Sequence, residues 1–401
     1  MLARNVAQQV LVCTPSNAAA DLVMVRLLKH FPILRALRAN ATSRFPSDMD
    51  AKLKPHTLYD EEKGCYYTPA DLSTYQVVVA TLSSSRNVAE TNFRPDYIFI
   101  DEAGHATEAD ALLPLAAFYN ANTSGSDKAM HVVLAGDHKQ LGPVVQSPYC
   151  VRHQYDVSIM ERLMMQAPYA REEGAEHNSH FVVKLLNNYR SHPKLIEVPN
   201  RLYYDNELLA KAKPDLTHLY VGWEELPNPN VPLVFHGVQG KNVREGRSPS
   251  YCNLEEIDVV RGWLRKLQDH RQVGFDGSQV GIVTPYSKQA TKLREACQKM
   301  GLTKVRVGTV EAMQGDERRV VLVSTVRSHS ETTLTDIKQL LAFDKVHDLG
   351  FVGQPKRVNV SLTRAKALLI VIGDPNILKG DPNWRAVLDF SHAEQCVTGV
   401  R

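Results

Sequence analysis

Short apolar runs alternate with amphipathic stretches along almost the whole of this 401-residue chain. The runs are uninterrupted, which is the pattern of strands in a parallel sheet that is buried on both faces. They fall into two sets, residues 9–13, 77–80, 97–100 and 131–135, and residues 231–235, 280–283, 305–307, 320–324 and 368–372. Amphipathic stretches at residues 19–30, 108–119, 254–268 and 288–300 predict helices that cover the sheets. The pattern predicts an α/β fold with two parallel-sheet layers in tandem.

The break between the two layers is expected near residues 165–182, where residues 170–176 are polar and lack apolar periodicity. We therefore predict a first domain over residues 1–176 and a second over residues 177–401, which suits the length and the apolar content of 43%. Residues 42–76 and 327–355 are irregular and are interpreted as insertions.

Composition points to an intracellular enzyme. No apolar run approaches the length of about 18 residues that a membrane-spanning helix needs, and no signal peptide is evident. The six cysteines include no C-x-x-C pair, which favours a reducing compartment. A net charge of +3 is nearly neutral, so nucleic-acid contacts would come from local patches.

One set of residues has a spacing that could offer four zinc ligands: Cys150, His153, His177 and His180. The separation between the two pairs is loose, and the segment is otherwise a charged loop. We interpret these side chains as surface residues in a connector.

Polar residues follow the apolar runs at the places where a parallel sheet binds its ligands, beyond the carboxyl ends of the strands. Asp101 and Glu102 come directly after residues 97–100, and Gln140 lies in the loop after residues 131–135. An adjacent acidic pair at a strand end can hold magnesium and position a water for phosphoryl transfer. We assign Asp101 to the magnesium ion, Glu102 to the attacking water, and Gln140 to sensing the terminal phosphate.

The second domain carries the remaining candidates. Arg190 and Arg364 are expected at the cleft between the domains, where they would stabilise charge on the transferred phosphoryl group and make hydrolysis depend on domain closure. Gln314, Gly315 and Glu317 follow another strand, and we expect them to bind the nucleotide ribose or to link the site to a nucleic-acid groove.

A phosphate loop of the form G-x-x-x-x-G-K-[ST] does not occur in these 401 residues. The nearest similar string, at residues 237–242, has the wrong glycine spacing and lacks a Ser or Thr after its lysine.

Taken together, the motifs resemble those of superfamily 1 helicases of the up-frameshift type. The strings that carry the resemblance are Thr-Pro-Ser-Asn at 14–17, Asp-Glu-Ala-Gly at 101–104, Gly-Asp-His-Lys-Gln-Leu-Gly-Pro at 136–143, Tyr-Arg-Ser-His-Pro at 189–193, Thr-Pro-Tyr at 284–286, Gln-Gly-Asp-Glu at 314–317 and Leu-Thr-Arg at 362–364. The Ala-Gly after the acidic pair, with residues 40–45, 235–238 and 244–250, is most similar to the Armitage or Moloney-leukaemia-virus-ten branch.

This resemblance implies two tandem RecA-like domains, a P-loop NTPase/helicase core, and a 5′-to-3′ RNA helicase that uses ATP and Mg²⁺. It also implies a cytoplasmic protein of ribonucleoprotein granules that acts with small-RNA silencing factors. A family member should carry its phosphate loop upstream of Val10, so we expect the first domain to be incomplete here. Such a sheet would expose apolar surface, and the chain alone would bind ATP weakly.

Single-stranded RNA is expected to lie across hydroxyl-rich strand ends in both domains, through sequence-independent contacts to its backbone. In the first domain, we assign these contacts to Thr14, Pro15, Ser16, Asn17, Thr81 and Ser83, although such residues also serve as plain helix caps. In the second domain, we assign them to Thr284, Pro285, Tyr286 and Thr309, with Tyr286 offering a ring for stacking.

Three functions remain open on the sequence alone. The first is part of an active ATP-dependent RNA helicase, and the second is an RNA-binding scaffold protein without ATPase activity. The third is a DNA helicase of the same superfamily.

Overall fold

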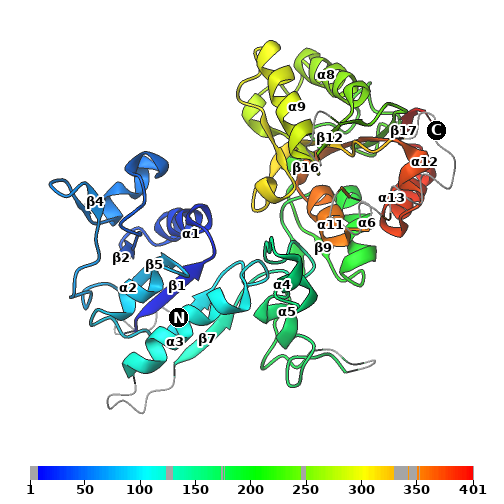
Figure 1. The fold of residues 1–401 in the computed structure, drawn as a ribbon. Coiled ribbons are helices and arrows are strands. Elements are labelled where there is room, and N and C mark those ends of the chain that lie inside the picture. The colour runs from blue at the N-terminus through cyan, green and yellow to red at the C-terminus, as the bar shows by residue number, and fades with distance from the viewer. Residues whose placement is uncertain are drawn as a thin grey trace. The chain divides into compact units, whose positions relative to one another are not determined.

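The chain divides into two compact units, Met1–Val183 and Lys184–Arg401, and each unit is built around one parallel sheet (Figure 1). The computed structural model describes residues 8–122, 130–172, 175, 177–244, 250–328, 342, 350–351 and 353–400. The expectation of an α/β fold with two parallel-sheet layers is confirmed.

The sheet of the first unit has the strand order β2-β5-β1-β6-β7. Its strands are β1 (Val10–Thr14), β2 (Ala36–Arg38), β5 (Val77–Thr81), β6 (Tyr97–Ile100) and β7 (His131–Leu134). Every pairing is parallel, with Val10 opposite both Val77 and Tyr97. The apolar runs predicted four of these strands to within a residue or two. The edge strand β2 was missed because three residues are too few to show a pattern.

Helices of the first unit are α1 (Asn17–His30), α2 (Ser85–Ala89), α3 (Glu108–Asn122), α4 (Pro148–Arg152) and α5 (Ile159–Leu163). The segment interpreted as an insertion, residues 42–76, contains the 3₁₀ turns η1 (Pro46–Asp48) and η2 (Ala51–His56) and the hairpin of β3 (Tyr59–Asp60) and β4 (Cys65–Tyr66). Leu53 and Tyr66 of this segment are buried against Met24 of α1 in one hydrophobic cluster. The insertion is therefore part of the core of this unit.

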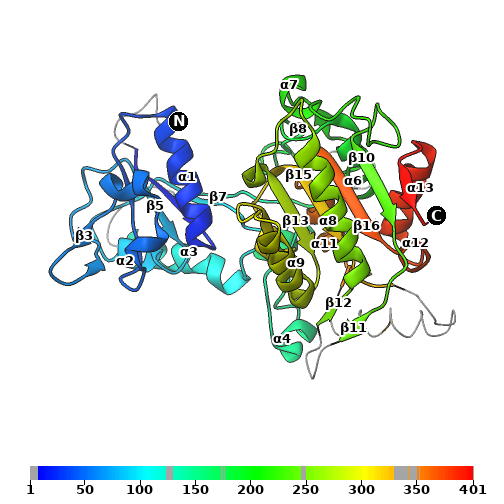
Figure 2. The ribbon, with the colours of Figure 1, turned by 90° about the horizontal axis from the view of Figure 1, so that it is seen from above.

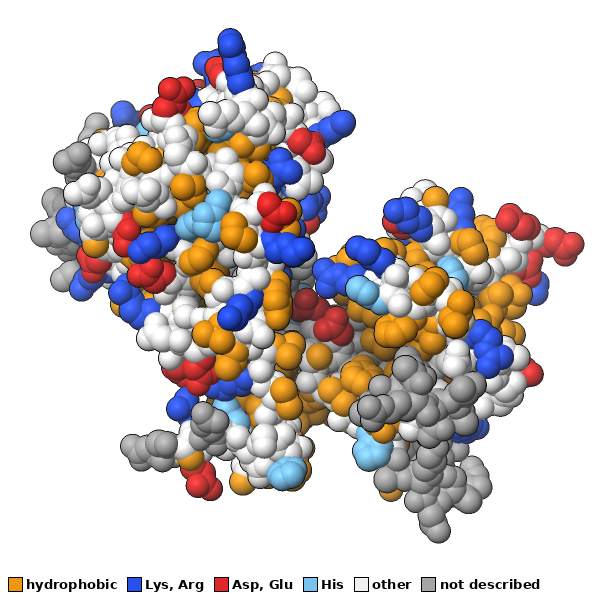
Figure 3. Space-filling model, turned by 180° about the vertical axis from the view of Figure 1, so that it is seen from behind, with side chains coloured by type: hydrophobic (Ala, Val, Ile, Leu, Met, Phe, Trp, Pro, Cys, Tyr) orange, Lys and Arg blue, Asp and Glu red, His pale blue; other side chains and the backbone are white. Residues whose placement is uncertain are grey.

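The terminal strand β7 is less well covered than the rest of its sheet. Val132 is 41% exposed and Val133 is 38% exposed, although successive side chains of a strand point to opposite faces. Leu112, Leu113 and Tyr119 of α3 are also exposed. Figure 3 shows hydrophobic side chains on the surface of the first unit, the right-hand body in that view. Both faces of β7 thus carry exposed apolar surface, which proteins normally avoid at an edge strand.

We expect this exposure to make the first unit the less protected one. Amides of β7 and α3 should exchange with solvent faster than those of β5, whose residues are all buried. Hydrogen exchange followed by mass spectrometry on the 401-residue chain, and on residues 184–401 expressed alone, measures this. The second unit should show the same protection in both samples, whereas equal protection of β7 and β5 would contradict the prediction.

The sheet of the second unit has the order β14-β13-β15-β16-β10-β17, and all its pairings are parallel. Its strands are β10 (Leu233–Gly237), β13 (Val280–Thr284), β14 (Arg306–Thr309), β15 (Arg318–Ser324), β16 (Ala365–Gly373) and β17 (Val397–Gly399). Two-stranded pairs join β8 (Asn187–Asn188) to β9 (Leu209–Ala210) and β11 (Val243–Arg244) to β12 (Tyr251–Cys252). The five predicted runs all form strands of the large sheet.

Figure 2 shows α8 (Leu254–Asp269) and α9 (Ser287–Lys299) across one face of this sheet. Further helices with described bounds are α6 (Pro193–Tyr203), α7 (Pro214–Thr217), α11 (Pro355–Leu362), α12 (Pro375–Leu378) and α13 (Pro382–Ala393), and described 3₁₀ turns are η3 (Gly277–Gln279) and η4 (Glu311–Met313). Trp263 of α8 and Leu293 of α9 belong to one core cluster with Ile282 and Leu322 of the sheet. Most of the expected insertion at residues 327–355 lies outside the described residues. No helix in the described part of the chain is long and apolar enough to cross a membrane.

A completely buried carboxyl group lies behind the end of β15. Glu256 of α8 accepts hydrogen bonds from Ser324 Oγ at 2.5 Å and from the backbone N–H of Val326 at 2.9 Å. Val326 has a φ of 75°, a left-handed conformation that is rare for a β-branched residue, so Glu256 helps to hold a strained turn. Burial raises the pKa of Glu256 to about 8, against the opposing effect of these hydrogen bonds.

This pKa predicts how stability depends on pH. The folded state keeps a proton on Glu256 that the unfolded state, with an ordinary pKa near 4.5, has lost, so the free energy of unfolding should fall as pH rises from about 5 to about 8. The glutamine of Glu256→Gln cannot ionise. The free energy of unfolding of this variant, measured by denaturant unfolding, should therefore depend less on pH between about 5 and about 8. The exposed neighbour provides the control, since Glu255→Gln should leave the curve unchanged. Parallel curves for the parent and Glu256→Gln would show that the carboxyl does not titrate in this range.

Candidate active site

The acidic pair lies where β6 ends, beside β1. The N–H of Asp101 donates to the carbonyl of Cys13 at 2.9 Å, and Glu102 adopts a left-handed φ of 56° in a turn closed by the hydrogen bond from His105 N to Glu102 O. Within the described residues, the half-buried carboxylate of Asp101 has no hydrogen-bond or ion-pair partner. A strand-end carboxylate with no protein partner fits Mg²⁺, which takes one or two carboxylates and completes its shell with water and phosphate oxygens.

Two glycines let the next loop approach the acidic pair. The N–H of Ala103 donates to the carbonyl of Ala135 at 2.8 Å. A Cβ on Gly104 would lie 2.9 Å from the carbonyl oxygen of Asp137, and one on Gly136 would lie 3.0 Å from the backbone nitrogen of Ala103. The Ala-Gly that follows the acidic pair therefore serves close packing between two loops.

Gln140 is held within its own loop by Asp137. Its Nε2 donates to Asp137 Oδ2 at 2.8 Å, while the N–H of Lys139 donates to Asp137 Oδ1 at 2.9 Å. The Gln140 amide was expected to meet a terminal phosphate, and Asp137 was not identified as its partner. An aspartate that begins a turn three residues before a glutamine is the signal that was available for it.

In the second unit, Arg190 lies in a loop that is fixed at both ends. Asn188 Oδ1 accepts from the N–H groups of Arg190 at 2.9 Å and of Ser191 at 3.0 Å, which forms an Asx turn. Ser191 Oγ donates to the carbonyl of Ala365 at 2.6 Å, and His192 N donates to the carbonyl of Lys366 at 2.9 Å. The loop is thereby attached to the start of β16.

Three sequence motifs meet at Glu317. Arg190 Nε donates to Glu317 Oε2, Arg190 Nη1 donates to the carbonyl of Thr363 at 3.2 Å, and Lys366 Nζ lies 3.0 Å from Glu317 Oε1. Burial alone would raise the pKa of Glu317, but the charges of Arg190 and Lys366 outweigh it and lower that pKa. The carboxylate therefore stays ionised and orients the Arg190 guanidinium. Lys366 was not assigned from the sequence, although it lies two residues after the Leu-Thr-Arg string at 362–364.

Gln314 and Gly315 lie in the turn that precedes Glu317. The Oε1 atom of Gln314 is buried, and no hydrogen bond reaches it from any described residue. An unmet buried acceptor is unfavourable by about 1–3 kcal/mol, and a hydroxyl donor such as that of a ribose would satisfy it. Gly315 is exposed next to it, at a φ of 72°.

Arg364 is buried inside the second unit, whereas the sequence predicted a position at a cleft for both arginines. Its side chain is 2% exposed, with Nε donating to the carbonyl of Val360 at 3.1 Å and Nη2 donating to Thr363 Oγ1 at 3.1 Å. The reason is local, because the last carbonyls of α11 attract a cation. Arg364 therefore contributes to the core of the second unit.

The hydroxyl-rich strand ends of the first unit are adjacent, since Thr14 is paired with Thr81 across β1 and β5. Thr14 and Thr81 are buried, and their hydroxyls donate to Ser16 O at 2.8 Å and to Ser84 Oγ at 2.9 Å. Pro15 is half-buried, whereas Ser16, Asn17 and Ser83 are exposed. Only these exposed side chains present polar groups to solvent.

In the second unit, Thr284 is paired with Thr309 at the ends of β13 and β14. Thr284 is fully buried, and its Oγ1 has no hydrogen-bond partner among the described residues, while Pro285 and Thr309 are half-buried. Tyr286 is only 2% exposed, with its ring centroid 5.8 Å from that of Tyr251. The expected stacking of a base on Tyr286 does not fit this placement, because the ring fills the core at the start of α9.

The residues weighed as zinc ligands make other contacts. His177 Nδ1 lies 3.0 Å from the carbonyl of Tyr169, and the ring of His153 lies 4.6 Å from that of Tyr149. In the part of the chain that the structure describes, no group of three or more His, Cys, Asp or Glu side chains could hold a metal ion. A magnesium ion on Asp101 needs no such group, because the nucleotide and water supply its other ligands.

Two family models, both described as "AAA domain", match residues 60–148 and 155–376. The chain is 40% identical to "Putative helicase MOV-10" of Gallus gallus over 98% of this chain and 42% of the relative. It is 38% identical to "RNA helicase Mov10l1" of Homo sapiens, covering 96% of this chain and 31% of that protein. It is 28% identical to "Probable RNA helicase armi" of Drosophila melanogaster, covering 97% and 34%.

These similarities confirm the resemblance found in the motifs. The chain spans less than half the length of each of these three relatives.

Proposed function

The chain belongs to the AAA-domain family whose model spans residues 155–376, and from this premise we propose that it is the motor region of an ATP-dependent RNA helicase. The observation that carries the proposal is the edge of the first sheet. There, β1 and β6 are neighbours, so the acidic pair after β6 and the exposed Ser16 and Asn17 after β1 share one edge. This shared edge supports the proposal, because the residues that we assign to phosphoryl transfer and to the phosphate backbone follow neighbouring strands.

The residues present fit a magnesium nucleotide in part. Asp101 would hold the metal ion, and Gln314 Oε1 would accept a hydrogen bond from a ribose hydroxyl. Arg190 would face the negative charge that develops on the transferred phosphoryl group. Bound Mg²⁺ and ATP supply the phosphoryl group and its charge neutralisation. Glu102 would orient a water molecule and take its proton. The backbone amides and lysine of a phosphate loop are the components that this sequence does not supply.

Two measurements test the proposal. The 401-residue chain should bind a single-stranded oligoribonucleotide, with affinity that falls as salt rises because phosphate contacts release counterions. A longer polypeptide with a phosphate loop upstream of residue 1 should hydrolyse ATP when RNA is present and should unwind RNA duplexes. RNA binding without hydrolysis in the longer polypeptide would favour the scaffold function, and preferential unwinding of DNA would favour a DNA helicase.

We further propose a cytoplasmic role in small-RNA silencing, within ribonucleoprotein granules and with 5′-to-3′ movement. The support is the motif resemblance to the Armitage branch. Imaging of the tagged protein, sequencing of co-purified RNA and unwinding of substrates with single-stranded tails of either polarity test these points. A nuclear protein that carries no small RNA would contradict them.

A further inference from the structure

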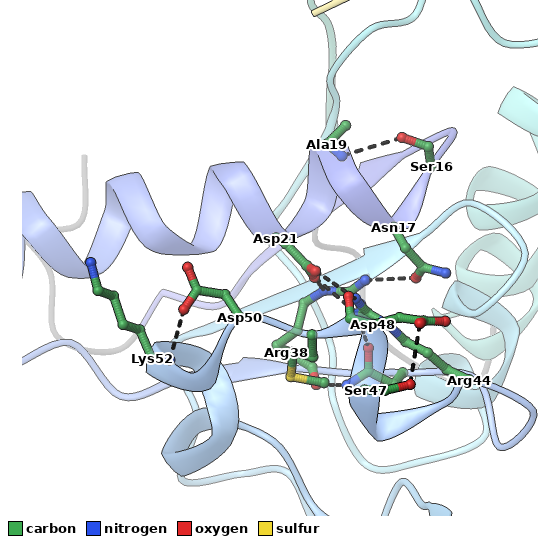
Figure 4. Close-up of polar contacts among 12 residues, drawn as sticks. Ser16, Asn17, Ala19, Asp21, Arg38, Arg44, Ser47, Asp48, Asp50 and Lys52 are labelled. Carbon is green, nitrogen blue, oxygen red and sulfur yellow. Dashed lines mark hydrogen bonds and ion pairs between the residues drawn. The ribbon is translucent and has the colours of Figure 1, made fainter. Parts of the chain in front are cut away.

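A cluster of charged and amide side chains lies under the first turn of α1 (Figure 4). Asp21 of α1 accepts from Arg38 Nε at 2.9 Å, from Arg44 Nη1 at 2.9 Å and from Arg44 Nη2 at 2.5 Å. Arg38 belongs to β2 and Arg44 to the loop after it, and they are 1% and 8% exposed. The cluster thus ties the start of α1 to the edge of the sheet.

Asp21 is the partly buried carboxylate of the cluster, and the exposed Asp48 adds a second negative charge that acts on Arg44. Two guanidinium groups share the one carboxylate of Asp21, and their other acceptors are neutral: Asn17 Oδ1, Asn40 Oδ1 and the carbonyls of Ala39 and Asp48. Burial lowers the pKa of Arg38, Asp21 opposes this, and the charge of Arg44 lowers it further. Arg44 Nε is also buried with no partner among the described residues. Since the amino end of a helix carries partial positive charge, this end of α1 favours an anion.

Asn17 is an exposed member of the cluster, and Arg38 fixes its orientation. Arg38 Nη2 donates to Asn17 Oδ1 at 2.8 Å. A guanidinium has only donors, so the amide oxygen must be the atom that faces it. The amide nitrogen then points away from the arginines, as Figure 4 shows. A hydrogen-bond donor is thereby held toward solvent at the first turn of α1.

We propose that Arg38, anchored by Asp21, is a positioning residue that presents the Nδ2 group of Asn17 to a phosphate oxygen of single-stranded RNA. The inference rests on the RNA-binding function proposed above and adds two residues, Asp21 and Arg38, that the sequence analysis did not assign. The contact is independent of base identity, as a translocating motor requires. Pre-orientation by a buried partner avoids the entropy of ordering the amide on binding.

The substitution Asn17→Asp separates positioning from a purely structural role. The new carboxylate would keep an acceptor for Arg38 Nη2, so the melting temperature should stay the same or rise. It would offer no N–H and would repel phosphate, so the dissociation constant for RNA should increase at least about tenfold. Asn178→Asp is the matched control in the same unit, because Asn178 is exposed and its Oδ1 accepts from His180 N, a bond that aspartate retains.

A double-mutant cycle tests the role of Arg38 itself. Arg38→Lys keeps the positive charge. The single ammonium group of lysine cannot bind Asp21 and Asn17 at the same time, as the planar guanidinium of arginine does. The substitution should weaken RNA binding several-fold in the parent chain and should have no further effect when Asn17 is alanine, because the two residues act through one contact. Additive losses would show that Arg38 does not act through Asn17.

The experiment measures fluorescence anisotropy of a labelled oligouridylate of about 12 nucleotides with the 401-residue chain, and thermal melting of each variant. If the parent chain shows no RNA affinity, the proposed function fails. If the parent binds and Asn17→Asp binds equally well, the positioning inference alone is overturned. Loss of RNA affinity in Asn17→Asp without loss of melting temperature, with an unaffected Asn178→Asp, supports it.

Discussion

Replacing Arg190 with alanine should lower ATP turnover by about a thousandfold or more in a polypeptide that carries a phosphate loop upstream of residue 1. An arginine that meets the charge of a transferring phosphoryl group contributes effects of about 10³ to 10⁵ in turnover. Arg190 is suited to this role because Glu317 and the carbonyl of Thr363 hold its guanidinium in one orientation. The melting temperature should change little, since the side chain is about one-third exposed.

Arg364 supplies the informative comparison. Because its guanidinium is buried at the end of α11, Arg364→Ala should lower both turnover and melting temperature. Arg201→Ala, on the exposed side of α6, should change neither. Steady-state phosphate release measures the turnover of the three variants, and differential scanning fluorimetry measures their melting temperatures. If Arg190→Ala keeps turnover within a few-fold of the parent, the group does not touch the reacting phosphate.

Replacing Glu102 with glutamine in the same longer polypeptide should lower turnover at least about a hundredfold, because the amide keeps the shape of the side chain but cannot accept a proton from water. RNA affinity in the presence of ATP should be retained, since Glu102 is assigned no contact with RNA. Single-turnover hydrolysis and anisotropy with labelled RNA measure the two effects.

The left-handed conformation of Glu102 gives this prediction its structural basis. A non-glycine residue with a φ of 56° is held there by its surroundings, here the turn closed by His105 N. Glu90→Gln, at an exposed position in the same unit, is the control. Equal loss of RNA binding and hydrolysis in Glu102→Gln would indicate a folding defect instead of a lost base, and the assignment would then be wrong.

Much of the fold could be predicted because strands buried on both faces need uninterrupted apolar residues. The run at residues 97–100 coincides with β6, and the run at 280–283 lies within β13. The positions of Asp101 and Gln140 at strand ends follow from the same reasoning. The edge strands β2 and β17 were not predicted, because each has only three residues and one neighbour in its sheet.

The sequence by itself determined which residues form the strands and that the motif residues follow them, since both depend on local patterns of apolar and polar residues. Only the tertiary structure decided the partners of those residues. Arg190 meets Glu317, 127 positions away, and Arg38 meets Asn17 across 21 positions. The burial of Tyr286 was likewise decided by packing, which brings its ring against that of Tyr251. The physical reason is that hydrogen bonds and burial depend on which side chains share a volume, and residues distant in sequence share one only after the sheets have formed.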